Sequence, residues 1–235
     1  ELLQAVTDHR ITEQEVDERV EELLKAAFTY PESSKETKRK LEGQKDLLYQ
    51  EHHELAEQAA EESMVLMKND GNLLPLSFGQ KIGIIGDFAF QPRFQGAGSS
   101  SVNAIRVEKV AECIGKTDFT LLGMEKGYLR NGKEDKKLEN DALKLAERAD
   151  VILYFLGLGE QEESEGIDRT SINIPQNQLS LLHKIARQKK EVVAVLSTGS
   201  VVGTWWKQDC KAILLTGLSG EAGAAAVVRV LTGEV

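Results

Sequence analysis

The hydrophobic residues near the start of the chain follow a helical spacing. The motif Thr12-Glu-Gln-Glu15 is a capping box, which predicts that a helix begins there. Apolar residues then recur three or four positions apart and share one face of that helix: Val16, Val20, Leu23, Leu24 and Ala27. The stretch Glu32–Gln50 is rich in lysine and glutamate and is typical of a linker with some exposed helix. We therefore expect one amphipathic helix followed by a polar connection.

Farther along, helical patterns alternate with short apolar runs. A helix is predicted over about Glu54–Met67, with Leu55, Ala59, Met64 and Met67 on its inward face. The predicted strands are Lys81–Ile85, Phe119–Leu122, Val151–Leu156, Glu191–Leu196 and Ala212–Leu215. The predicted helices between and after them are Val107–Cys113, Leu138–Arg148, Pro175–Arg187 and Glu221–Leu231. Strands interleaved with helices imply a mostly parallel sheet covered on both faces, so the predicted fold class is α/β, a three-layer α/β/α sandwich.

The longest of the strand-like runs, Val151–Leu156, leads directly into an acidic segment. Its acidic residues and final arginine are Glu160, Glu162, Glu163, Glu165, Asp168 and Arg169. In open α/β sheets, ligands bind beyond the carboxyl ends of the strands, so carboxylates at this position are candidates for acid/base chemistry. A solvated acidic turn is the alternative, and the composition alone favours it.

A glycine- and serine-rich segment, Pro92–Ser101, is a second candidate for ligand binding. Its arginine, amide and hydroxyl groups suit the hydrogen bonds that sugar hydroxyls make, and its glycines let the backbone approach a ligand closely. The residues concerned are Arg93, Gln95, Ser99 and Ser100. A surface loop without a ligand is the alternative.

Composition and spacing argue against several classes of function. The 235 residues carry a formal net charge of -9, which argues against a nucleic-acid or anionic-membrane binder. No apolar run approaches the ~20 residues of a membrane-spanning helix. The glycine-rich segments lack the spacing of a dinucleotide-binding or P-loop motif, and Cys113 and Cys210 fit no metal-ligand spacing. We therefore expect no cofactor and no metal, and we expect His52 and His53 to be exposed rather than catalytic.

Five segments of the chain have a characteristic order and spacing. They are Ala60–Asn69 with Leu73–Leu76, Lys81–Gly86, Gln95–Ser100, Glu163–Arg169, and Gly217–Gly223 with Leu231–Val235. In this order they resemble the second, α/β-sandwich domain of glycoside hydrolase family 3, of the β-glucosidase and β-xylosidase type. Residues 1–28 resemble the last helix of the (β/α)8 barrel that ordinarily precedes this domain. The resemblance implies a fragment that lacks the catalytic barrel.

The resemblance also implies roles for the residues of the acidic segment. Glu165 occupies the position of the family's general acid/base, and the aspartate nucleophile would lie on the missing barrel. The neighbouring glutamates are expected to raise the pKa of Glu165 and so favour its acid form. Asp168 and Arg169 are expected to brace the loop by an ion pair rather than contact substrate. Ile167 stands where relatives often carry an aromatic residue, so contacts with the leaving group are expected to differ.

The predicted organisation is a terminal barrel helix at 1–30, a linker at 31–53 and an α/β-sandwich domain at 54–235, cut short at its C-terminus. The predicted function is part of a retaining β-glycosidase of the β-glucosidase type, with β-glycoside or oligosaccharide substrates and the upstream barrel as partner in cis. The fragment by itself is expected to be inactive, and the protein is expected to be cytoplasmic, without nucleic-acid or membrane partners. Two alternatives stay open: a non-catalytic carbohydrate-binding or interaction module, and a nucleotide-binding α/β domain. The sequence leaves the sugar, the linkage and the oligomeric state open.

Overall fold

The computed structural model describes residues 1–115, 117, 119–188 and 190–235, and at 31–33 it describes the backbone alone. Contacts divide the chain into two compact units, Glu1–Glu51 and His52–Val235. The first unit consists of helices: α1 (Leu2–Thr7), α2 (Glu13–Thr29), α3 (Pro31–Glu42) and the first part of α4 (Lys45–Ser63). The second unit holds the end of α4, the sheet and the remaining helices.

The helix α2 begins where the capping box predicts. The hydroxyl of Thr12 accepts a hydrogen bond from the Glu15 amide at 3.2 Å, and the Glu15 carboxylate accepts one from the Thr12 amide at 2.8 Å. Apolar residues of the predicted face, and one beyond it, are exposed: Val20, Leu23, Leu24 and Phe28. The lysine- and glutamate-rich stretch that follows is helical, as α3 and the start of α4. Ion pairs one turn apart, such as Lys40 with Glu36 at 2.8 Å, stabilise a helix of this composition.

The prediction of a helix over Glu54–Met67 is wrong at its C-terminal end. The helix α4 ends at Ser63, and Val65–Asn69 forms strand β1, which pairs antiparallel with β6 (Ala212–Leu215). Three of the four residues expected to face inward are exposed: Leu55, Ala59 and Met67. A short apolar run is compatible with a helix or a strand, and here the pairing edge that β6 offers decides for the strand.

In the described residues, the other strands match their predicted positions. They are β2 (Lys81–Ile85), β3 (Thr120–Glu125), β4 (Val151–Gly157), β5 (Glu191–Ser197) and β6. The strand order is β1-β6-β5-β4-β2-β3, and every neighbouring pair except β1 with β6 is parallel. Every residue of β4 is buried, as a continuous apolar run predicts for a central parallel strand.

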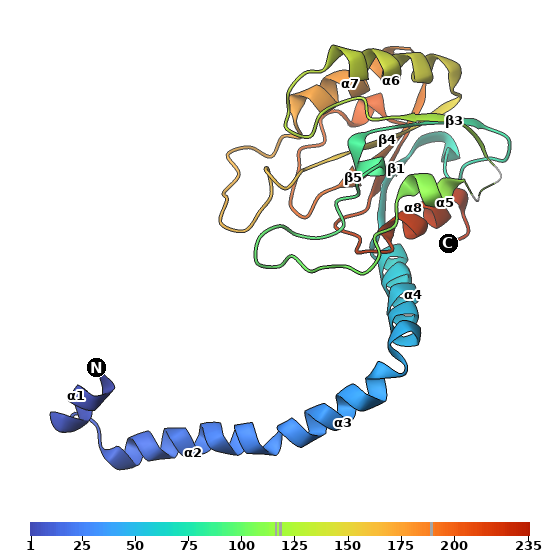
Figure 1. The fold of residues 1–235 in the computed structure, drawn as a ribbon. Helices are drawn as coiled ribbons and strands as arrows, with labels where there is room; N and C mark the ends of the chain where they lie inside the picture. The colour runs from blue at the N-terminus through green and yellow to red at the C-terminus, as the bar shows by residue number, and fades with distance from the viewer. Residues whose placement is uncertain (116, 118, 189) are drawn as a thin grey trace. The chain divides into compact units, whose positions relative to one another are not determined.

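Helices cover both faces of the sheet and complete the three layers (Figure 1). The helices α6 (Lys136–Arg148) and α7 (Gln176–Arg187) lie together on one face, and α5 (Val110–Ile114) and α8 (Gly223–Thr232) lie together on the other. The predicted α/β sandwich is therefore confirmed. Among the described residues, we find no helix whose length and apolar character would let it cross a membrane.

His53 is buried, contrary to the prediction. Its ring nitrogens lie 2.8 Å from a Glu221 carboxylate oxygen and 3.2 Å from a Glu108 carboxylate oxygen. The prediction failed because α4 starts at Lys45, so that His53 lies within a packed helix rather than beside a helix start. These contacts join the end of α4 to the segments that precede α5 and α8.

The strand order places a topological switch point between β2 and β4. From β2 the chain continues to β3 on one side, and β4 lies on the other side of β2. In open α/β sheets, ligands bind outside the carboxyl ends of the strands at such a point. Two segments leave the sheet there: the glycine-serine loop (residues 92–101), which follows β2, and the acidic loop (residues 158–169), which follows β4.

Candidate active site

The acidic loop leaves the sheet at Gly157, the last residue of β4. The buried side chain of Gln178 in α7 fixes this point, because its Oε1 accepts the Gly157 amide at 2.9 Å and its Nε2 donates to the Gly157 carbonyl at 3.0 Å. A side chain at position 157 would overlap the Ser197 carbonyl of β5, so glycine lets the two strands meet. The sequence analysis missed Gln178, although a polar residue on the inward face of a predicted helix was a signal for it.

Three of the four glutamates stabilise the acidic loop itself. Glu162 accepts the backbone amide at the start of the loop, from residue 159, at 2.9 Å. Glu163 accepts the amide of Gly199 at 3.0 Å, which joins the acidic loop to the loop after β5. Glu160 lies 3.5 Å from Nη1 of Arg130. These three carboxylates are engaged in loop structure, and the fourth glutamate is the one available to a ligand.

Arg93 is buried and joins the glycine-serine loop to the acidic loop. Its guanidinium donates to the carbonyl oxygens of Gln95, Leu158 and Glu163 at 3.1, 2.9 and 2.8 Å. Its side chain is 1% exposed, so the two loops enclose nearly all of it. The Gln95 side chain exchanges two hydrogen bonds with the backbone of Val102 and so closes the glycine-serine loop. The sequence predicts that Arg93 and Gln95 bind a ligand, but this geometry favours loop bracing for both.

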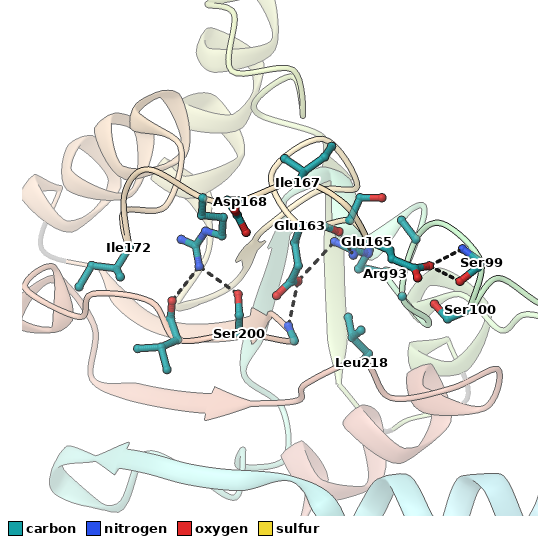
Figure 2. Close-up of a pocket in the computed structure, with 16 residues that line it drawn as sticks. Arg93, Ser99, Ser100, Glu163, Glu165, Ile167, Asp168, Ile172, Ser200 and Leu218 are labelled. Carbon is teal, nitrogen blue, oxygen red and sulfur yellow. Dashed lines mark hydrogen bonds and ion pairs between the residues drawn. The ribbon is translucent and has the colours of Figure 1, made fainter.

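Glu165 is exposed at the edge of a pocket, and its carboxylate meets Ser99 of the glycine-serine loop (Figure 2). Its Oε2 accepts hydrogen bonds from both the hydroxyl and the backbone amide of Ser99, the latter at 2.9 Å. These donors stabilise the charged carboxylate, the hydroxyl most strongly, and hold the pKa of Glu165 below its usual value. The expectation that the neighbouring glutamates raise this pKa is wrong, because their carboxylates are engaged elsewhere.

Asp168 and Arg169 do not form the predicted ion pair within the described part of the chain. Instead, the Arg169 guanidinium donates to the Ser200 hydroxyl at 3.0 Å and to the Val201 carbonyl at 2.8 Å. Arg169 therefore braces the end of the acidic loop against the loop after β5. Asp168 and Ser100 line the pocket with exposed side chains.

The pocket between these loops has a volume of about 800 Å³ and lies beyond the carboxyl ends of β2, β4, β5 and β6. Its larger apolar lining residues are Ile167, Ile172, Val201 and Leu218. A groove that combines an exposed carboxylate with apolar walls can bind a partly polar molecule and exchange a proton with it. Over the described residues, no group of histidine, cysteine, aspartate and glutamate side chains could hold a metal ion.

A smaller cavity of about 290 Å³ lies beside the first pocket, at the ends of β2, β3 and β4. Asp87 in this cavity lies 2.6 Å from Nε of Arg130 and 3.0 Å from Nζ of Lys126. The Arg130 guanidinium stacks on the Phe88 ring, 4.3 Å from its centroid. The sequence analysis missed this group, although Asp87 stands directly beyond a predicted strand. The charges of Asp87, Lys126 and Arg130 are paired with one another. Arg130 also lies 3.5 Å from Glu160, so this cluster supports the acidic loop.

Comparison with known proteins identifies relatives of the whole chain. The family model described as "Glycosyl hydrolase family 3 C-terminal domain" matches residues 64–235. The thermostable beta-glucosidase B of Acetivibrio thermocellus is 39% identical over 237 residues, which cover 100% of this chain and 30% of that protein. The exo-alpha-(1->6)-L-arabinopyranosidase of Bifidobacterium breve is 39% identical over 201 residues, which cover 78% of this chain and 26% of that protein. The chain thus spans less than a third of the length of these two relatives.

Solved structures of other proteins have the same fold over most or all of this chain. The structure of a GH3 beta-glucosidase from Bifidobacterium adolescentis matches with a TM-score of 0.74 and 40% identity, over 79% of this chain and 27% of that chain. A mutant beta-glucosidase from Listeria innocua in complex with laminaribiose matches with a TM-score of 0.85, over 100% of this chain and 32% of that chain. At 22% identity, the second likeness concerns the fold alone.

Proposed function

Because the chain belongs to glycoside hydrolase family 3, as its C-terminal domain, we propose that it supplies the general acid/base of a retaining β-glycosidase of the β-glucosidase type. The proposed acid/base is Glu165. We propose that the aspartate nucleophile lies on a (β/α)8 barrel of the same protein, as the family resemblance implies, and that terminal β-linked sugars are the substrates.

The observation that supports this proposal is that the four glutamates of the acidic loop have different partners. Glu160, Glu162 and Glu163 are engaged by an arginine or by backbone amides, whereas Glu165 stands exposed at the pocket with a serine as partner. A carboxylate without a permanent cation can take up and give back a proton during a reaction. Glu165 is also the residue at the family's acid/base position.

The chemistry needs two carboxyl groups about 5–5.5 Å apart on either side of the anomeric carbon. In the first step the aspartate attacks that carbon, the glycosidic C–O bond breaks, and Glu165 gives its proton to the leaving oxygen. In the second step Glu165 takes a proton from water, the water oxygen attacks the anomeric carbon, and the aspartate leaves. The 235-residue chain alone is expected to show no turnover, because the nucleophile is not part of it.

The test is the substitution Glu165→Ala in the enzyme that joins this chain to its barrel. We expect kcat/KM for aryl β-glucosides to fall by roughly 10²–10⁴-fold when the leaving group is poor, and far less when it is good, because only poor leaving groups need protonation. Azide should restore part of the turnover of substrates with good leaving groups.

The matched control is Glu134→Gln, which removes a charge from a side chain that is 78% exposed and lies outside both pockets. Its kinetics should equal those of the parent enzyme. A small loss for Glu165→Ala that is the same for every leaving group would contradict the proposal and favour a non-catalytic carbohydrate-binding module. Turnover by the chain alone would contradict the proposal that the nucleophile lies on the barrel and the acid/base on this domain.

The sequence of this domain does not determine which sugar the enzyme accepts. Two relatives that are each 39% identical to it are named for different activities, a beta-glucosidase and an exo-alpha-(1->6)-L-arabinopyranosidase. We therefore propose that the glycone is selected by residues of the barrel, and that this domain contributes proton transfer and contacts to the leaving group.

A further inference from the structure

The acidic loop and the glycine-serine loop are joined at Glu165 by contacts from both backbone and side chain. The Glu165 amide donates to the Ala97 carbonyl at 3.3 Å. Its Oε2 accepts the Ser99 amide at 2.9 Å and the Ser99 hydroxyl. The two loops follow β4 and β2, which are neighbouring parallel strands. The partner of Glu165 is therefore set by the sheet, although 66 residues separate it from Ser99 in the chain.

Gly98 lets the two loops approach this closely. Its φ angle is 93°, in the region that favours glycine. A Cβ at this position would lie 2.9 Å from the Glu165 Cβ and 3.3 Å from its Oε2. A larger residue would separate the loops and remove the Ser99 donors from the carboxylate.

Both donors of Ser99 are directed at one oxygen of Glu165, and both favour the ionised carboxylate. The other charged residues that line the pocket are Arg93, Glu163, Asp168 and Arg169. In the described residues, none of these four forms a hydrogen bond or an ion pair with Glu165. Arg93 and Arg169 instead donate to carbonyl and hydroxyl oxygens of the loops. The protonation of Glu165 is therefore controlled chiefly by Ser99.

We propose that Ser99 is a positioning residue that selects between the base form and the acid form of Glu165. This inference rests on the proposed acid/base role of Glu165. In the arrangement observed, Ser99 holds the ionised carboxylate that the second step uses to take a proton from water. For the first step Glu165 must carry a proton, and a hydroxyl can serve both forms because it donates to a carboxylate and accepts from a carboxylic acid. The Ser99 amide can only donate.

The first test measures the proton affinity of Glu165 directly in the 235-residue chain, by NMR titration of its carboxyl carbon. Ser99→Ala is expected to raise the pKa of Glu165, because the hydroxyl is the larger cause of its depression. Ser99→Thr keeps a hydroxyl and is expected to restore the depression. Ser101→Ala is the matched control in the same loop, since its hydroxyl is directed at the Gly96 carbonyl, 3.5 Å away. An unchanged pKa in Ser99→Ala would overturn the proposal.

The second test follows activity in the enzyme that contains this chain and its barrel. In Ser99→Ala the alkaline limb of kcat/KM for poor leaving groups should move to higher pH, since Glu165 stays protonated longer. The acidic limb of the hydrolysis step, measured as kcat with good leaving groups, should also move to higher pH, since Glu165 must be ionised to take a proton from water. Ser99→Thr should reverse both changes, which a merely structural role for the serine would not require.

The two tests separate this inference from the proposed function. If Glu165→Ala shows no dependence on the leaving group, the acid/base role fails, whatever the titration of Ser99→Ala gives. If Glu165→Ala behaves as expected and Ser99→Ala changes neither the titration nor the pH profile, the role assigned to Ser99 fails alone.

Discussion

At the scale of single residues, two glycines allow two causes of instability to be compared: steric crowding by a new side chain, and an unfavourable backbone conformation. An alanine side chain at Gly157 would overlap the Ser197 backbone, whereas at Gly132, with a φ angle of 75°, it would meet nothing within 4 Å. We expect Gly157→Ala to lower the free energy of unfolding by about 3 kcal/mol, since β4 and β5 must separate. Gly132→Ala should cost about 1 kcal/mol for the left-handed backbone alone. Urea unfolding, followed by the fluorescence of the tryptophans at 205 and 206 in the second unit, measures both, and equal losses would contradict the argument.

Single residues also show what spacing reveals and what it leaves out. Glu165 could be singled out because it follows a buried strand and stands at a recognisable position of a family motif. The direction in which its pKa shifts could not be predicted. Its neighbours in sequence are glutamates, whereas its neighbours in space are the donors of Ser99. The same reason explains why the bracing role of Arg93 could not be predicted. Its partners Leu158 and Glu163 lie 65 and 70 residues away in the chain.

At the scale of elements, Arg93 connects the loops that follow β2 and β4. Replacing it by methionine removes a donor from three carbonyl oxygens and removes the cation that lies 3.6 Å from the Glu163 carboxylate. We expect Arg93→Met to lower the free energy of unfolding by about 3 kcal/mol, the cost of breaking a buried ion pair by removing one partner. Arg148→Met, at an exposed position, should change it by less than about 0.5 kcal/mol. Thermal unfolding of the two variants would show equal midpoints if Arg93 had no such role.

Elements differ in how well the sequence predicts them. Strand β4 is unambiguous, because a continuous apolar run bounded by polar residues suits a central parallel strand. Strand β1 was predicted as the end of a helix, since Val65–Asn69 has no alternation and directly follows a helix. Its conformation depends on hydrogen bonds to β6, about 145 residues farther along the chain. A local pattern carries no information about such a partner.

At the scale of the whole second unit, the His53 cluster makes stability depend on pH. Burial lowers the pKa of His53, but its hydrogen bonds to Glu221 and Glu108 outweigh burial and raise the pKa overall. Arg106 lies 2.8 Å from Glu108 and opposes the rise. The folded state thus binds the proton more tightly than the unfolded chain. This stabilisation is complete below a pH of about 6.5 and is lost as pH rises through the elevated pKa.

We therefore expect His53→Gln to destabilise the second unit most at pH 5.5–6, and progressively less as the pH rises above about 6.5. Unfolding midpoints of the parent and the variant, measured across this range, give the difference directly. His52→Gln is the matched control, because His52 is the neighbouring histidine and is exposed. A difference between parent and His53→Gln that does not change with pH would contradict the linkage.

The sequence by itself determined the α/β class, all the parallel strands, the helix with its capping box, and the place of the acidic and glycine-serine loops. These features follow from local periodicity and from the order of segments, which are properties of the chain alone. The tertiary structure decided that Val65–Asn69 is a strand, that His53 is buried between carboxylates, that Arg93 and Arg169 brace loops, and that the donors of Ser99 meet the carboxylate of Glu165. Each of these depends on groups far apart in sequence that meet only when the sheet brings the ends of its strands together, so no local pattern could encode them.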